Sequence, residues 1–140
     1  MSTATDSGRR PFVFRLDLHS GVPVYRQIID QVMAGIASGA LSTGDQLPTV
    51  RQLAVDLEIN PNTVVRAYKE LEIRGLLDTH HGTGTFIGNN KVKRNEVEHQ
   101  RQLNQLVSEF TARAGAAGFT VDELLEQLKE LQAESKKKRK

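Results

Sequence analysis

The sequence contains no cysteine, so the chain has no disulfides, no thiolate metal ligands and no thiol nucleophile. It also lacks any stretch of about 18 uninterrupted apolar residues, the length that a membrane-spanning helix requires. No apolar run preceded by basic residues stands near its beginning, as a secretory signal would demand. These absences predict a cytoplasmic protein that does not enter the membrane.

A large excess of positive charge is missing as well. The formal net charge is +2, but residues 136–140 alone carry five positive charges, which leaves −3 for residues 1–135. Between residues 11 and 88, six Arg and Lys residues are accompanied by eight Asp and Glu residues. Any affinity for nucleic acid must therefore come from the placement of individual side chains rather than from overall charge.

The first ten residues are rich in serine and threonine and end in Arg9 and Arg10, which predicts a disordered arm. A solvated terminus is the simpler interpretation, and insertion of the two arginines into a minor groove is the alternative. From Pro23 to Gly39, apolar residues recur every four positions, which predicts an amphipathic helix. The stripe consists of Val24, Ile28, Val32 and Ile36, broadened by Tyr25, Ile29 and Met33.

A short helix is predicted from Thr49 to Leu57. Thr49 is a preferred N-cap, and Gln52 follows three residues later, as in a capping box. Its buried face consists of Leu53, Ala54 and Leu57. Only Glu58 and Ile59 separate this helix from the next cap, so a helix-turn-helix is expected. If the turn needs a left-handed residue, Glu58 costs roughly 1 kcal/mol more than glycine would.

A second helix is predicted from Asn60 to Gly75. Asn60 is a preferred N-cap, Pro61 suits the first helical position, and Gly75 can end the helix in a left-handed conformation. One face is expected to be buried and consists of Val64, Ala67, Tyr68 and Leu71. The opposite face carries Asn62, Thr63, Arg66 and Lys69. These polar side chains can bond base edges or phosphates when a helix lies in a major groove, so this helix is the candidate DNA reader.

Two short strands around a glycine-bearing tip follow. Residues 76–79 and 85–87 flank the sequence His80-His81-Gly82-Thr83-Gly84, which predicts a hairpin, the wing of a winged helix. A zinc site at the two histidines and Asp78 is disfavoured, because adjacent residues on a strand point to opposite faces. A phosphate loop is disfavoured because no helix or Gly-Lys-Ser/Thr follows the glycines. No metal is predicted.

Two further helices are expected in the C-terminal third. One begins at about Asn95 and is broken by the sequence Gly115-Ala116-Ala117-Gly118. The other begins at a capping box formed by Thr120 and Glu123 and runs to about Glu134. Their apolar positions include Leu103, Leu106, Val107, Phe110 and Ala114 in the first helix, and Val121, Leu124, Leu125, Leu128 and Leu131 in the second. Outside a complete winged helix these stripes need a covering surface, and a second copy of the chain is the most economical one.

The predicted fold class is α+β, mainly α, with an N-terminal winged helix-turn-helix followed by a two-helix C-terminal dimerisation extension. The expected boundaries are a disordered arm at 1–10, a DNA-binding domain at 11–88, a helical dimerisation region at 89–134 and a basic tail at 135–140. The tail is expected to be solvated, and non-specific attraction to DNA is the alternative.

The segment LPTVRQLAVDLEINPNTVVRAYKELEIRGLLDTHHGTGTF, from Leu47 to Phe86, strongly resembles the winged-helix domain of GntR-family bacterial transcriptional regulators. The motif NPNTV-x-RAY-x-x-LE and the short two-helix C-terminal region are similar to the YtrA-like subgroup. The resemblance covers residues 11–88 and extends more weakly to about residue 131. It implies a homodimer that binds an inverted-repeat operator in double-stranded DNA, usually as a repressor, and is released by an effector. No cofactor is implied.

The resemblance also implies roles for individual residues. Arg51 matches an arginine that contacts DNA, and Thr49 matches a helix-capping position that can touch phosphate. The polar start of the recognition helix is matched by Asn60, Asn62 and Thr63, and the wing tip by His81 and Gly82. Better-studied subgroups have arginines where this chain has Pro61 and Val65, so the reading of bases must be redistributed. The candidates are Arg66 and Asn62 for hydrogen bonds to bases, and Val65 for contact with a thymine methyl group.

Simpler interpretations remain for these residues and for the chain as a whole. Arg66 could pair with Glu70 on the helix surface, Arg51 could pair with Asp56, and Lys69 fits either a solvated or a DNA-binding role.

A winged helix that binds protein rather than DNA is the main functional alternative. The polar recognition face counts against it, because protein interfaces need apolar anchors. No catalytic triad, carboxylate pair or metal spacing is present, so an enzyme is not expected. An effector site could lie between the C-terminal helices or at the dimer interface.

Overall fold

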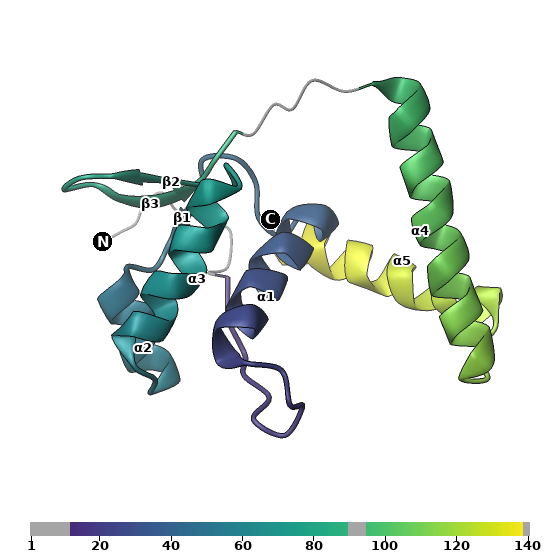
Figure 1. Cartoon of the computed structure of the whole chain (residues 1–140), viewed down its shortest axis with the longest axis horizontal. Coiled ribbons are helices and arrows are strands. Elements are labelled where there is room, and N and C mark those ends of the chain that lie inside the picture. The colour runs from purple at the N-terminus through teal and green to yellow at the C-terminus, as the bar shows by residue number, and fades with distance from the viewer. Residues whose placement is uncertain (1–11, 90–94, 139–140) are drawn as a thin grey trace. The chain divides into compact units, whose positions relative to one another are not determined.

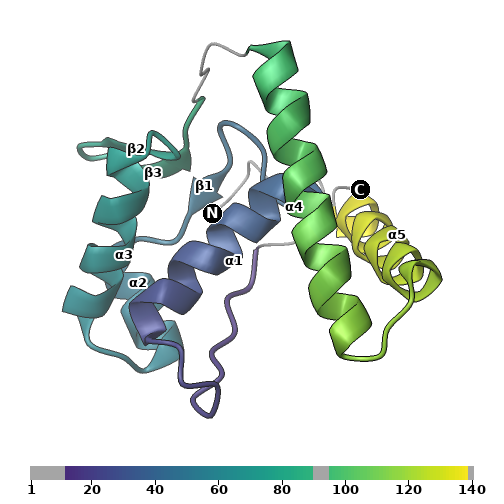
Figure 2. The same cartoon turned by 45° about the vertical axis from the view of Figure 1, so that its right-hand side comes forward.

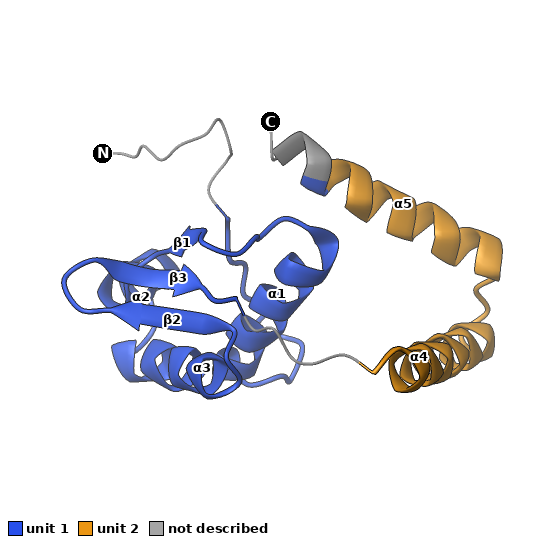
Figure 3. Ribbon diagram, turned by 90° about the horizontal axis from the view of Figure 1, so that it is seen from above, with its two compact units in different colours: residues 1–90, 135–140 blue, residues 91–134 orange. Residues whose placement is uncertain are grey.

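A computed structural model describes residues 12–89 and 95–138, without the side chains of residues 136–138. The described elements are α1 (Val24–Ser38), β1 (Gln46–Leu47), α2 (Val50–Leu57), α3 (Pro61–Ile73), β2 (Leu77–His80), β3 (Gly84–Ile87), α4 (Glu96–Ala116) and α5 (Val121–Lys138). The predicted arm at residues 1–10 lies outside the described residues, as do the side chains of the basic tail. No helix in the described ranges combines the length and apolar content needed to cross a membrane. The chain forms two compact units, residues 1–90 with 135–140 and residues 91–134 (Figure 3).

Helices α1 and α3 pack side by side and supply half of the buried core residues of the first unit (Figures 1 and 2). The predicted stripe of α1 is buried at Ile28 and Val32, which are fully inaccessible to solvent. The predicted apolar face of α3 is buried in full and consists of Val64, Ala67, Tyr68 and Leu71. The spacing of apolar residues along both helices therefore determines which face of each helix enters the core.

Helices α2 and α3 form the predicted helix-turn-helix. The Thr49 hydroxyl accepts a hydrogen bond from the Gln52 amide at 3.1 Å, and the Asn60 side-chain oxygen accepts one from the Asn62 amide at 2.8 Å. Both predicted caps are confirmed. Glu58 has φ 56° and ψ 49°, so the turn does place a residue with a side chain in the left-handed region. Its amide closes α2 on the carbonyls of Ala54 and Val55.

The sheet contains one strand more than the sequence predicted. β3 lies between β1 and β2, and both neighbours are antiparallel to it. Gln46 pairs with Phe86 and Leu47 pairs with Thr85, in a segment where the sequence predicted no strand. Two residues are too few to display alternation, so β1 exists because β3 offers an edge and because Leu47 enters the core.

The second unit consists of α4 and most of α5. Asn95 caps α4 by accepting a hydrogen bond from the Glu98 amide. The predicted capping box of α5 is complete, because the Thr120 amide donates to Glu123 at 2.8 Å and the Glu123 amide donates to the Thr120 hydroxyl at 3.2 Å. α5 continues to Lys138, four residues beyond the predicted end at about Glu134. Lysine is a good helix former, so the basic tail does not stop the helix.

Candidate nucleic-acid interface

The outward face of α3 presents polar side chains to solvent. Asn62, Arg66 and Lys69 are exposed, whereas Thr63 is half-buried at the edge of the face. Val65 retains 45% of its accessible surface, so its methyl groups are also available for contact. The structure thus brings together the side chains predicted to read bases. An exposed helix face with this chemistry suits contact with a major groove.

The caps at the starts of α2 and α3 leave hydrogen-bond donors free. Thr49 and Asn60 accept hydrogen bonds through their side-chain oxygens, so the Thr49 hydroxyl proton and the Asn60 amide group can still donate. Arg51 is exposed in the first turn of α2, and it forms no hydrogen bond or ion pair with any described residue. The alternative pairing with Asp56 is therefore not formed. These donors suit contacts with phosphate oxygens.

Arg66 does not form the predicted surface pair with Glu70. Glu70 instead accepts a hydrogen bond from Arg74 at 3.0 Å, one turn further along α3. The guanidinium of Arg66 lies over the ring of Tyr25, with its Cζ atom 3.7 Å from the ring centroid. In the sequence Tyr25 only broadened the apolar stripe of α1. Its partner stands 41 residues away, so no local pattern could have revealed this contact.

The hydroxyl of Tyr68 bonds to the backbone just before the N-cap of α2. It donates a hydrogen bond to the carbonyl oxygen of Pro48 at 2.7 Å, and the rest of the side chain is buried in the core. Burial raises the pKa of the Tyr68 hydroxyl well above its ordinary value, so it remains a donor throughout the usual pH range. This bond joins α3 to the residue that precedes Thr49. The sequence showed Tyr68 only as a core residue.

Replacing Tyr68 with phenylalanine is expected to lower the free energy of unfolding by about 1 kcal/mol, because the Pro48 carbonyl loses its buried donor. Urea denaturation at one fixed protein concentration measures the change. Tyr25→Phe is the matched control, since the Tyr25 hydroxyl has no hydrogen bond to a described residue. Equal stability of the Tyr68→Phe variant and the wild type would contradict the role given to this bond.

The hairpin of β2 and β3 extends beyond the helices as a wing (Figure 1). The amide of Thr83 donates to the carbonyl of His80 at 3.0 Å, and Gly82 has φ 78°, a conformation that favours glycine. His81 and Gly82 are exposed at the tip. The side chain of Gln46 donates to the Thr83 carbonyl at 3.3 Å, so β1 supports the tip from one side.

The two wing histidines lie at the edge of the sheet, and one of them packs against an aromatic ring. The ring of His80 lies against the ring of Phe86, with centroids 5.7 Å apart. Across the described residues, no cluster of three or more His, Cys, Asp or Glu side chains could hold a metal ion. The wing therefore presents hydrogen-bonding side chains that a nucleic acid could contact.

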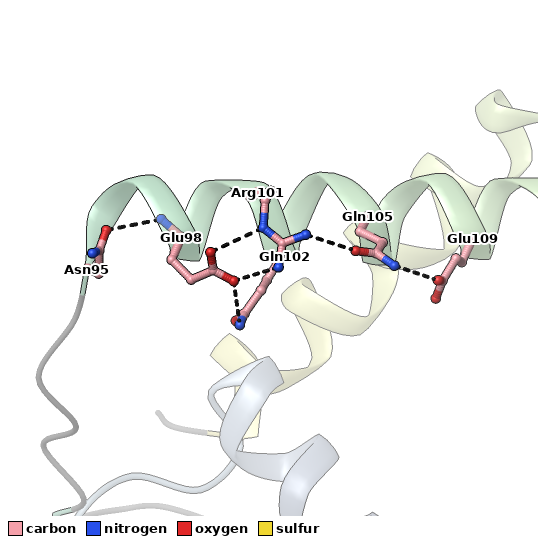
Figure 4. A network of polar contacts seen from close by, with 6 residues as sticks. All are labelled: Asn95, Glu98, Arg101, Gln102, Gln105 and Glu109. Atoms are coloured by element: carbon pink, nitrogen blue, oxygen red, sulfur yellow. Dashed lines mark hydrogen bonds and ion pairs between the residues drawn. The ribbon is translucent and has the colours of Figure 1, made fainter.

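Each helix of the second unit has one polar and one apolar face. Figure 4 shows a chain of hydrogen bonds along α4 that links Glu98 through Arg101 and Gln105 to Glu109. The predicted dimerisation residues lie elsewhere on the helices and are exposed in the single chain, with Leu124 half-buried: Leu103, Leu106, Val107, Phe110, Leu125, Leu128 and Leu131. α4 and α5 do not pack along each other. These apolar stripes consequently lack a cover from the described residues of their own unit.

Residues 24–87 match the model of bacterial regulatory proteins of the gntR family. Over 129 residues the chain is 40% identical to the HTH-type transcriptional repressor YtrA of Bacillus subtilis (strain 168), an alignment that covers 89% of this chain and 95% of that protein. The structure of YtrA from Sulfolobus acidocaldarius, a GntR-family transcription factor, is 31% identical with a TM-score of 0.52, and the match covers 71% of this chain and 97% of that one.

A transcriptional antiterminator from Listeria monocytogenes EGD-e has a similar structure, with 28% identity, a TM-score of 0.61, and coverage of 84% of this chain and 88% of that one. The similarity to YtrA spans nearly the whole of both chains, so it includes the C-terminal helices as well as the winged helix. The predicted fold class and family resemblance are both confirmed. The chain is a DNA-binding transcriptional regulator, not an enzyme, and belongs to the YtrA-like subgroup of the GntR family.

Proposed function

We propose that this regulator represses transcription by binding an inverted-repeat operator as a homodimer, with one α3 helix in each of two major grooves. The observation that carries the proposal is the outward face of α3, where Asn62, Val65, Arg66 and Lys69 stand together in solvent. Amide, guanidinium and methyl groups are the ones that distinguish base pairs in the major groove. Two such helices about 34 Å apart would read half-sites one helical turn apart.

Local charge supports this orientation on DNA. Residues 11–88 have no overall excess of positive charge, yet Arg51, Arg66 and Lys69 are all exposed on the helix-turn-helix. The nearby carboxylate of Glu70 is engaged by Arg74 at 3.0 Å, which reduces its repulsion of phosphates. Few phosphates would be neutralised by each protomer, so binding should depend less on salt than it does for strongly basic regulators.

The exposed apolar stripes support the homodimer. The large apolar side chains of α4 and α5 that are more than 45% exposed in a single chain include Leu103, Leu106, Val107, Phe110, Leu125, Leu128 and Leu131. Soluble proteins rarely leave such surfaces open, and apolar patches of this kind are typical of interfaces. A symmetric partner offers the same stripes in return. The assembly would act in the cytoplasm, and a small-molecule effector would bind between the helices or at the dimer interface.

Selection from a random duplex library tests the proposal, because the library contains every candidate half-site and requires no assumption about the operator. Purified protein is expected to enrich an inverted repeat whose half-sites are centred about 10 base pairs apart. Enrichment of a single half-site would contradict the dimeric arrangement. No enrichment over the starting library would contradict sequence-specific binding and would favour the alternative, a winged helix that binds another protein.

A further inference from the structure

One contact of the DNA-reading face reaches outside the helix-turn-helix. Tyr25 stands in the first turn of α1, and its ring lies 3.7 Å from the guanidinium carbon of Arg66 in the second turn of α3. Within residues 12–89 and 95–138, Arg66 makes no hydrogen bond or ion pair. Among the described residues, the contact with the Tyr25 ring is therefore the one polar or aromatic interaction of this guanidinium.

A second contact joins the helices that carry Tyr25 and Arg66. It lies between Met33 and Arg74, each eight residues beyond the first pair, which shows that α1 and α3 run in the same direction. In that contact the Arg74 Nη1 atom donates to the Met33 sulfur at 3.4 Å. Between the two contacts, Ile28 and Val32 of α1 are fully buried in the core. Tyr25 itself is partly buried and packs against this core.

Stacking leaves the arginine ready for recognition. A guanidinium that lies on an aromatic ring uses its flat face, while its five N–H donors remain in the plane and free to bond. Bidentate recognition of guanine uses that planar edge. An exposed arginine loses rotamer freedom when it binds, and one that is already stacked loses less.

We infer that Tyr25 is a positioning residue that aims Arg66 at its base, so that α1 takes part in operator specificity through a residue that does not itself read DNA. The inference rests on the proposed function and assigns specificity to a Tyr25–Arg66 pair. The stacked arrangement persists in the complex with the operator. If the contact instead had to break before Arg66 could reach DNA, Tyr25 would weaken operator binding rather than strengthen it.

A double-mutant cycle tests the pair. Dissociation constants for a selected operator and a scrambled duplex are measured by fluorescence anisotropy for the wild type, Tyr25→Leu, Arg66→Ala and the double variant. Tyr25→Leu is expected to weaken operator binding by about two- to fivefold, with little change on scrambled DNA. In the Arg66→Ala background the same change should have no further effect on the operator. Tyr25→Phe keeps the ring and should restore the discrimination lost in Tyr25→Leu.

Three results would overturn the inference. The first is an operator affinity that Tyr25→Leu leaves unchanged, and the second is one that it tightens. The third is a loss of operator affinity from Tyr25→Leu that is equally large in the wild type and in the Arg66→Ala background, which would show that Tyr25 acts only on the fold. Circular dichroism verifies that each variant is folded, and Tyr25→Phe provides a milder change at the same position. If the wild type itself fails to distinguish operator from scrambled DNA, the proposed function fails and the inference falls with it.

Discussion

Replacing Phe110 and Leu128 with glutamate is expected to separate the dimer into monomers and to weaken operator binding by about 100-fold or more. Phe110 on α4 is 48% exposed and Leu128 on α5 is 52% exposed in the single chain, each within an apolar stripe. A glutamate at either position would bury an unpaired charge in the interface, which is strongly unfavourable. A monomer also loses the gain that comes from linking two half-site contacts.

Light scattering after size-exclusion chromatography gives the mass of the free protein, and anisotropy gives its operator affinity. The matched control replaces Ala112 and Ala133 with glutamate, since both alanines are exposed and lie away from the apolar stripes. This control should remain dimeric. A Phe110→Glu, Leu128→Glu variant that stays dimeric, with unchanged affinity, would show that the protomers associate through another surface.

Replacing Arg66 with alanine is expected to weaken operator binding by about 1–3 kcal/mol, roughly 5- to 150-fold, with a much smaller loss on scrambled DNA. Arg66 is exposed on the outward face of α3 and has no described hydrogen bond or ion pair that would otherwise occupy its donors. A side chain that reads a base contributes only where that base is present. Its removal should therefore relax the sequence preference at one position of each half-site.

Arg51→Ala is the comparison for this prediction. Arg51 lies in the first turn of α2, where it suits a phosphate, so its loss should weaken operator and scrambled DNA by similar factors. Anisotropy titrations at one salt concentration compare the two variants. Equal losses on both duplexes for Arg66→Ala would remove Arg66 from the residues that read bases and leave it as a phosphate contact.

Local sequence signals predicted the helices with good accuracy. Thr49, Asn60 and Thr120 each act within three residues along the chain, and all three side chains accept the predicted capping hydrogen bonds. The buried faces of α1 and α3 follow from apolar spacing alone. A cap or a stripe depends only on neighbours in sequence, so a single chain displays it clearly.

The features that escaped prediction depend on distant partners. β1 exists through pairing with β3 some 40 residues later, and two residues carry no periodic signal. Likewise, Tyr25 and Arg66 meet only because α1 and α3 pack in parallel. The sequence alone predicted the DNA-contacting residues and the dimerisation stripes as candidates. The structure places them on exposed faces, and their roles stay predictions until they are measured.

The most direct test of the central claim is to follow the backbone amide resonances of the 15N-labelled protein while a duplex carrying the selected operator is added. The account predicts that shift changes cluster at residues 49–52, at residues 60–69 on α3 and at the wing tip, residues 81–83, with little change on the polar face of α4. Changes that avoid α3, or that are equal for a scrambled duplex, would contradict the claim that the outward face of α3 reads DNA.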